Sequence, residues 1–206
     1  MKILIIGGYG VFGGRLAALL RDLPVVVQVA GRSQDKARAF CQRQTGAAVF
    51  EPHGFDRAAL PDQLNALQPD LVIDASGPFQ DYPGDGYDVI RACIAAGVDY
   101  LDIADGSDFV SRIGSLNQAA REAGTFAITG VSTFPVISAA ALRELSQQGE
   151  IETVSAGMAP TPYAGMGPNV MRVVLGYTGA RLRLGRGGTG VGLADIRQAT
   201  IAAPGR

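Results

Sequence analysis

Five glycines within ten residues, in the segment IIGGYGVFGG (residues 5–14), constrain the fold of this chain more than any other feature. They follow an apolar run at residues 3–6 and precede a segment with helical spacing that begins near Phe12. Residues 8–13 read Gly-Tyr-Gly-Val-Phe-Gly, which is the pattern GxGxxG. This pattern between a strand and a helix is typical of a dinucleotide-binding turn.

The three glycines of the pattern have separate physical roles. Gly8 permits the tight turn, Gly10 lets a pyrophosphate approach the backbone without meeting a Cβ atom, and Gly13 lets the helix pack close to the strand. The unpaired N–H groups and the positive dipole end of the helix then face the phosphates. The alternative is a glycine turn that binds no ligand, and the surrounding pattern bears on that choice.

Strand-length apolar runs and segments with helical spacing alternate along the chain. Most of the runs are continuously apolar, which is typical of strands buried on both faces of a sheet. Successive parallel strands need crossover connections, and the helical segments supply them. The sequence therefore predicts a doubly wound α/β fold of the Rossmann type, a parallel sheet with helices on both faces. The six expected strands are residues 3–6, 25–30, 47–50, 71–74, 100–103 and 126–129.

The composition favours a small-molecule partner. The 206 residues carry a formal net charge of −1, and 47% of them are hydrophobic. No basic patch with interleaved aromatic residues favours a nucleic acid, and no apolar stretch approaches the roughly 18 residues that a membrane helix needs. The apolar start is too short for the core of a signal peptide, so we expect a cytoplasmic protein. The single histidine and two separated cysteines predict no metal site.

The end of the second expected strand indicates which dinucleotide fits. In NAD sites an Asp or Glu about 20 residues beyond the glycines binds the adenosine ribose hydroxyls. Here the strand runs into Gly31, Arg32 and Ser33, with no acid at its end. Arg32 can pair with a 2′-phosphate, and Ser33 and the start of the next helix add donors, so the sequence predicts NADP. Two alternatives stay open: Arg32 is a solvated loop residue, or Asp35 binds the ribose.

The end of the third expected strand holds Asp56 and the only histidine of the chain, His53. Asp56 suits two tasks equally well: contact with the adenine amino group, or capping of the helix that contains Leu60. His53 lies at the adenine end of the expected site, far from the nicotinamide. We therefore interpret His53 as a loop histidine and not as a catalytic residue.

The segments after the fourth and fifth expected strands are candidates for the reactive end of the site. Ligands of open α/β sheets bind outside the carboxyl ends of the strands. Asp102 and Asp105 should face the same crevice as the cofactor and are the only candidates for an acid/base or amine-binding role. The alternative for both is capping and loop solvation before a helix at Ser107. The residues expected along the ribose and nicotinamide are Ala75, Ser76, Gly77, Pro78 and Phe79.

The segments GGYGVFGG, AGRS, DASGPFQ and ACIAAGVDYLDIADG together resemble the saccharopine dehydrogenase-like family. The resemblance covers residues 1–149 and implies an amino-terminal NADP-binding Rossmann domain. It implies hydride transfer between NADP(H) and an amino, imino or carbonyl-type substrate. By position, it implies a pyrophosphate turn of Gly8, Tyr9, Gly10, Val11, Phe12 and Gly13, an adenosine phosphate site of Arg32 and Ser33, and a nicotinamide contact at Gly77, Pro78 and Phe79.

The part of the chain after Gly149 departs from that family. Members that resemble this chain continue into a larger α/β substrate domain, whereas only residues 150–206 remain here. This segment starts with the strand-like IETVSAGMA and becomes rich in Gly, Arg and Pro. We interpret it as the truncated start of a second α/β domain, with a natural tail as the alternative. Its arginines 181, 183 and 186 could bind an acidic substrate or could simply be solvated.

The residue types that the sequence lacks narrow its chemistry. The only lysines are Lys2 and Lys36, so neither a Schiff-base lysine nor a Tyr-x-x-x-Lys pair is available. The first hypothesis is therefore an NADP-dependent oxidoreductase domain, and the second is a regulatory or sensor module that binds the dinucleotide without turnover. A missing second domain would leave apolar surface exposed, which predicts self-association.

Overall fold

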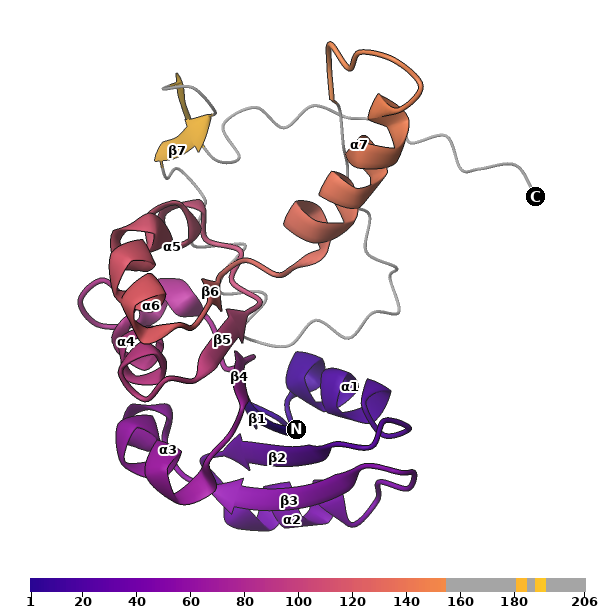
Figure 1. The fold of residues 1–206 in the computed structure, drawn as a ribbon, viewed down its shortest axis with the longest axis vertical. Coiled ribbons are helices and arrows are strands. Elements are labelled where there is room, and N and C mark those ends of the chain that lie inside the picture. Colours follow the sequence, from indigo (N-terminus) through magenta and orange to yellow (C-terminus); the bar gives the residue numbers. More distant parts are fainter. Residues whose placement is uncertain (155–180, 185–187, 192–206) are drawn as a thin grey trace. The chain divides into compact units, whose positions relative to one another are not determined.

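The computed structural model describes residues 1–154, 181–184 and 188–191 (Figure 1). The chain divides into two compact units, Met1–Thr161 and Pro162–Arg206. In the second unit the described residues form an antiparallel pair of strands, β7 (Arg181–Leu184) and β8 (Gly188–Val191). Residues 151–154 form no strand, and the remainder of the expected strand-like segment lies outside the described residues, as does Arg186. The domain boundary at residue 149 and the truncated second domain stay predictions.

Six parallel strands form the sheet of the first unit, in the order β3-β2-β1-β4-β5-β6. The chain starts in the middle of the sheet and adds strands first on one side of β1 and then on the other. This order confirms the predicted doubly wound Rossmann fold and places its switch point between β1 and β4. The strands are β1 (Lys2–Ile6), β2 (Val26–Gly31), β3 (Val49–Gly54), β4 (Leu71–Asp74), β5 (Asp99–Asp102) and β6 (Ala127–Ile128).

The central strand β1 is buried on both faces, as its continuous apolar run predicts. Ile3, Leu4, Ile5 and Ile6 are all at most 5% exposed. Leu4 and Ile6 belong to one apolar cluster and Ile3 and Ile5 to another, because successive side chains of a strand point to opposite faces. Burial of each side chain stabilises the fold by about 1.5–3 kcal/mol relative to exposure.

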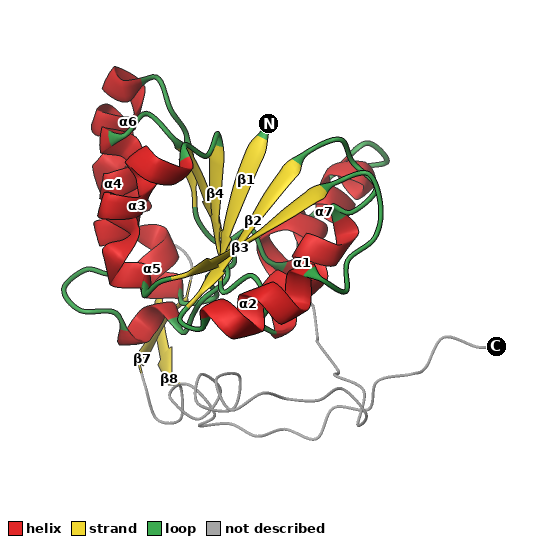
Figure 2. Ribbon diagram, turned by 90° about the horizontal axis from the view of Figure 1, so that it is seen from below, coloured by secondary structure: helices red, strands yellow, loops and turns green. Residues whose placement is uncertain are grey.

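Helices cover both faces of the sheet (Figure 2). The cluster with Ile3 and Ile5 packs against α1 and α2, whereas the cluster with Leu4 and Ile6 packs against α3, α4 and α6. None of the described helices is both long and apolar enough to cross a membrane. The helices are α1 (Val11–Leu19), α2 (Gln34–Cys41), α3 (Leu60–Leu67), α4 (Asp88–Ala95), α5 (Ser107–Ser111), α6 (Asn117–Ala123) and α7 (Ala139–Ser146). The chain also forms the short 3₁₀ turns η1 (Arg57–Ala59), η2 (Phe79–Asp81) and η3 (Ile113–Leu116), and the π-helical segment η4 (Thr133–Ser138).

The third strand differs from its expected position. We expected residues 47–50, and β3 runs over Val49–Gly54 instead, so that it includes Pro52 and His53. β3 is the edge strand of the sheet and pairs only with β2. An edge strand accepts a proline and needs fewer apolar residues than a central one, which explains why an apolar pattern did not locate it. His53 therefore lies in a strand and not in a loop.

Candidate functional site

The glycine turn between β1 and α1 is packed tightly against its surroundings. The Gly8 N–H donates to the carbonyl of Ala30 in β2 at 2.9 Å. A Cβ atom at Gly8 would lie 2.7 Å from the Ile5 carbonyl oxygen, and one at Gly13 would lie 2.3 Å from the Gly7 carbonyl oxygen. Both distances are shorter than Cβ contacts in proteins, so the fold itself requires glycine at these two positions.

Gly10 differs from the other two glycines because the fold constrains it little. It is exposed, and a Cβ atom there would approach only the Gly7 carbonyl oxygen, at 3.0 Å, within 4 Å. Gly10 precedes α1, which has no side-chain cap and no acidic residue in its first turn. The N–H groups and the positive end of this helix are therefore open to an anion, and this arrangement fits the phosphates of a dinucleotide.

The end of β2 carries a positive charge and no acid. Arg32 is exposed and forms no ion pair within the part of the chain that the structure describes. The Ser33 hydroxyl oxygen accepts the Lys36 N–H at 3.3 Å and so caps α2. Asp35 is exposed and lies 3.5 Å from Arg38, one turn along the same helix. The geometry here suits a 2′-phosphate better than a bare ribose hydroxyl.

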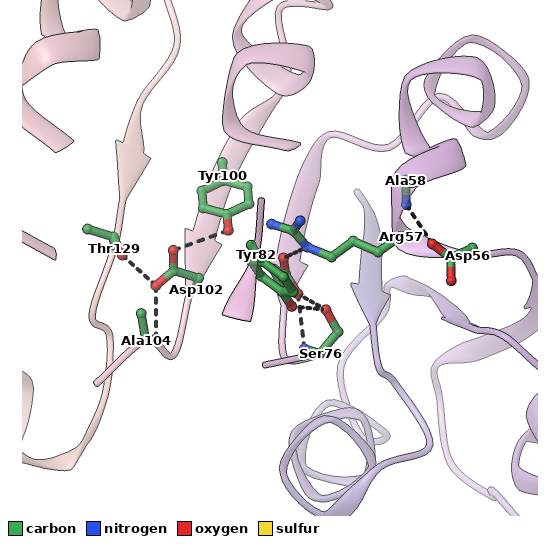
Figure 3. Close-up of polar contacts among 10 residues, drawn as sticks. Asp56, Arg57, Ala58, Ser76, Tyr82, Tyr100, Asp102, Ala104 and Thr129 are labelled. Carbon is green, nitrogen blue, oxygen red and sulfur yellow. Dashed lines mark hydrogen bonds and ion pairs between the residues drawn. The ribbon is translucent and has the colours of Figure 1, made fainter. Parts of the chain in front are cut away.

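His53 lies near the end of β3, and Asp56 lies two residues after it. The Asp56 carboxylate accepts the Ala58 N–H at 3.0 Å, so it performs the capping task, on the short turn η1 (Figure 3). Its contact with adenine stays a prediction. His53 is half-buried beside Glu51, and burial lowers the pKa of its imidazole more than Glu51 raises it.

A buried ion pair at the end of β4 was missed by sequence reasoning. The Asp74 carboxylate is fully buried and accepts the Arg57 Nε–H at 2.7 Å, the Ser76 N–H at 3.0 Å and the Ser76 hydroxyl at 2.6 Å. The Arg57 guanidinium lies over the Tyr82 ring, 3.6 Å from its centroid. The Tyr82 and Ser76 hydroxyls are 2.9 Å apart (Figure 3). We call Arg57, Asp74, Ser76 and Tyr82 the Asp74 network.

The Asp74 network keeps Arg57 charged and Tyr82 neutral. Burial acts to lower the pKa of Arg57, but Asp74 and Tyr82 outweigh it, so the pKa is raised. Burial, aided by the charge of Asp74, raises the pKa of Tyr82 to about 12. Ser76, a predicted cofactor contact, is thereby fixed in place by two partners. The network sets the course of the chain directly after β4.

Among the other predicted residues after β4, Gly77 and Pro78 form the turn and Phe79 lies in the core. The Gly77–Pro78 peptide bond is cis, and Phe79 is only 5% exposed. The Phe79 ring packs against Tyr82 and Phe109, with centroid distances of 5.5 and 5.4 Å. The nicotinamide contacts at these positions stay predictions, and Phe79 has in addition a packing role that the sequence did not indicate.

Asp102 is fully buried at the end of β5 and is surrounded by donors. Its carboxylate accepts hydrogen bonds from the Tyr100 hydroxyl at 3.1 Å, the Ala104 N–H at 2.9 Å and the Thr129 hydroxyl at 2.7 Å (Figure 3). It also accepts the Gly130 N–H at 2.8 Å. Burial raises its pKa, although these hydrogen bonds act in the opposite direction. The carboxylate thus joins the end of β5 to the segment after β6.

Asp105 lies three residues further and is exposed. Neither aspartate caps the helix that follows, because α5 starts at Ser107 after Gly106 and has no side-chain cap. The alternative combined capping with loop solvation: no side chain caps α5, whereas the exposure of Asp105 fits loop solvation. The acid/base role of the two aspartates stays a prediction. Like the glycine turn, both residues lie at the carboxyl ends of the strands.

A family model described as the saccharopine dehydrogenase NADP-binding domain matches residues 3–128. The chain belongs to this family. The match spans the sheet from β1 to β6, and it confirms the resemblance that the sequence segments indicated. The Met1–Thr161 unit is accordingly a Rossmann-type, NADP-binding domain. A search of curated proteins finds no match.

Several solved structures are similar to this chain, and the first of those described here shows the same fold. Apo saccharopine dehydrogenase (L-Glu forming) from Saccharomyces cerevisiae is 18% identical with a TM-score of 0.51, over 71% of this chain and 31% of that chain. A probable dehydrogenase from Thermotoga maritima is 13% identical with a TM-score of 0.49, over 74% of this chain and 42% of that one. Biliverdin reductase from Synechocystis, in complex with biliverdin and NADP+, is 20% identical with a TM-score of 0.46, over 72% and 44%. The chain thus spans less than half the length of each of these proteins.

Proposed function

We propose that this chain is the nucleotide-binding part of an oxidoreductase that transfers hydride between NADP(H) and an amino, imino or carbonyl-type substrate. The observation that carries the proposal is the uncapped start of α1 beside Gly10, combined with the exposed Arg32 at an acid-free strand end. The first feature suits a pyrophosphate and the second suits a 2′-phosphate. Membership of an NADP-binding family supports both assignments.

The phosphates would be bound mainly by backbone groups and by one guanidinium. In this proposal Arg32 pairs with the adenosine 2′-phosphate and Ser33 adds a donor while it caps α2. Asp56 would contact the adenine amino group through the carboxylate oxygen that does not accept the Ala58 N–H, so it could keep its cap on η1. The residues assigned to the pyrophosphate are Gly8, Tyr9, Gly10, Val11, Phe12 and Gly13.

The segment after β4 would hold the other half of the cofactor. NADPH supplies the hydride when it is bound, and the chain's own residues orient the ring and exclude water. The Asp74 network holds Ser76 in place and thereby positions the turn around it, which contains Ala75, Gly77, Pro78 and Phe79. Asp105 is the exposed member of the predicted acid/base pair, whereas Asp102 acts by holding the strand ends in position. The substrate itself would be bound largely by residues outside this sheet.

Replacing Arg32 with Ala is expected to reduce the preference for NADPH over NADH by about tenfold or more, because a charge-assisted pair with the 2′-phosphate is lost. Affinity for NADH, which lacks that phosphate, should change little. Both affinities can be measured by titration, with nicotinamide fluorescence as the signal. Arg38→Ala is the matched control, since Arg38 is an exposed arginine on α2 that pairs with Asp35. Equal losses for NADPH and NADH in Arg32→Ala would refute the assignment.

A further inference from the structure

The Tyr9 side chain extends from the glycine turn to the end of β2. Its hydroxyl oxygen accepts the Ser33 N–H at 2.9 Å, across 24 residues of sequence. Its ring lies directly against Gly31, the last residue of β2. A Cβ atom at Gly31 would lie 2.6 Å from Tyr9 Cε1 and 2.7 Å from both Cζ and the hydroxyl oxygen. Tyr9 therefore occupies the space in which a side chain at residue 31 would start.

This packing has a consequence for the choice of dinucleotide. NAD sites use a carboxylate at the end of the second strand to bind the ribose hydroxyls. Any side chain at Gly31, a carboxylate included, would collide with the Tyr9 ring. The backbone at Gly31 is not in the left-handed region that favours glycine. A side chain at residue 31 is thus opposed by contact with the Tyr9 ring, which would have to move to admit it, and not by backbone conformation.

The Tyr9 hydroxyl also offers a hydrogen-bond donor. A phenol can accept one hydrogen bond and still donate its own proton. The oxygen accepts from Ser33, and no acceptor for its proton is recorded among the described residues. Tyr9 is half-buried and so remains accessible to a ligand, and the adjacent Arg32 is exposed. A phosphate bound at Arg32 and Ser33 would therefore also lie beside the Tyr9 hydroxyl, which could donate a hydrogen bond to it.

We propose that Tyr9 determines the preference of this domain for NADP over NAD. The ring excludes an acid from the end of β2, and the hydroxyl donates to the adenosine 2′-phosphate beside Arg32. This inference rests on the proposed function, because it assumes that a dinucleotide binds at the glycine turn. The residues proposed to select NADP then include Tyr9, which lies in the glycine turn, in addition to Arg32 and Ser33 after β2.

Tyr9→Phe tests the donor, because phenylalanine keeps the ring on Gly31 and removes only the hydroxyl. We expect the affinity for NADPH and for adenosine 2′,5′-bisphosphate to fall by about tenfold, as for other hydrogen bonds to a charged group. Affinity for NADH and for ADP should change less than about twofold, because neither has a 2′-phosphate. The matched control is Tyr87→Phe, which removes the hydroxyl of a buried tyrosine that donates to the Phe109 carbonyl.

Gly31→Ala tests the exclusion of a side chain, because its Cβ atom would displace the Tyr9 ring. We expect this variant to lose the preference for NADPH and to unfold at a lower temperature than the wild type. In a Tyr9→Ala background the ring is absent, so Gly31→Ala should change the unfolding temperature little. Such non-additivity is typical of residues in direct contact.

The outcomes separate the inference from the proposed function. A wild type that binds neither NADPH nor adenosine 2′,5′-bisphosphate would refute the proposed function, and the inference with it. A wild type that prefers NADPH, with the same preference in Tyr9→Phe, would overturn only the inference. Equal losses for NADPH and NADH would also overturn it, as would tighter NADPH binding in Tyr9→Phe, which would mean that Tyr9 blocks the Ser33 N–H.

Discussion

Replacing Asp74 with Ala is expected to lower the free energy of unfolding by about 3–5 kcal/mol, which is the cost of leaving a buried charge without its partner. The Arg57 side chain is only 15% exposed and Asp74 is fully buried. Among the described residues Arg57 forms no second ion pair, and its Nη2 atom has no hydrogen-bond partner, so the loss of Asp74 leaves its charge uncompensated. Urea unfolding followed by circular dichroism measures the change.

Two further variants show whether the effect comes from the buried charge. Asp70→Ala removes a carboxylate that is 61% exposed, lies 3.9 Å from the amino-terminal nitrogen and accepts the Lys2 N–H at 2.7 Å, so it should cost only about 1–2 kcal/mol. Arg57→Met combined with Asp74→Ala leaves no charge buried and should be more stable than Asp74→Ala alone. A loss in Asp74→Ala no larger than that in Asp70→Ala would contradict the buried ion pair.

Gly13→Ala is the second substitution with a large expected effect. Its Cβ atom would lie 2.3 Å from the Gly7 carbonyl oxygen and 2.8 Å from the Gly7 carbonyl carbon, and both are backbone atoms that cannot rotate away. We expect a loss of about 3 kcal/mol in the free energy of unfolding, at the upper end of overpacking costs. NADPH binding should be lost as well, because the turn must shift to relieve the contact.

The neighbouring glycine provides a matched control for Gly13→Ala. A Cβ atom at Gly14 would approach only the Phe40 ring closely, at 3.2 Å, and a side chain can move. Alanine also has a higher helix propensity than glycine by roughly 1 kcal/mol, so Gly14→Ala should leave the unfolding temperature nearly unchanged. Equal destabilisation by the two substitutions would show that the close packing of the turn is not specific to Gly13.

The sequence predicted the parts of the fold that depend on local patterns. The glycines at 8 and 13 are required by close backbone contacts, so their spacing, with the apolar run before them and the helical pattern after them, indicated the strand-turn-helix unit. The buried run at residues 3–6 has no polar residue because β1 lies in the middle of the sheet. Apolar runs also located the other strands, whereas β3, an edge strand that includes Glu51, Pro52 and His53, extends beyond its expected residues.

The parts that the sequence did not predict depend on contacts between distant residues. Arg57 and Asp74 are 17 residues apart, and Tyr9 and Ser33 are 24 apart. No periodicity of the sequence links such pairs. They meet because the order of the strands brings the loop after β3 beside the loop after β4, and the loop after β1 beside the loop after β2, at the carboxyl ends of the strands. The sequence also did not predict the surroundings of Asp102. Its position at a strand end indicated an acid/base or amine-binding role, whereas its carboxylate accepts four hydrogen bonds within the domain.

Titration of the wild type and of Gly10→Ala with NADPH tests most directly whether the glycine turn is a dinucleotide site. Gly10 has a φ of −73°, and a Cβ atom there would meet only the Gly7 carbonyl oxygen, at 3.0 Å, so alanine needs a shift of a few tenths of an ångström and should leave the domain folded. The wild type should bind NADPH saturably and about tenfold more tightly than NADH, and Gly10→Ala should keep the wild-type unfolding temperature while losing most of that affinity. A folded Gly10→Ala that binds NADPH as tightly as the wild type, or a wild type that binds none, would contradict the site.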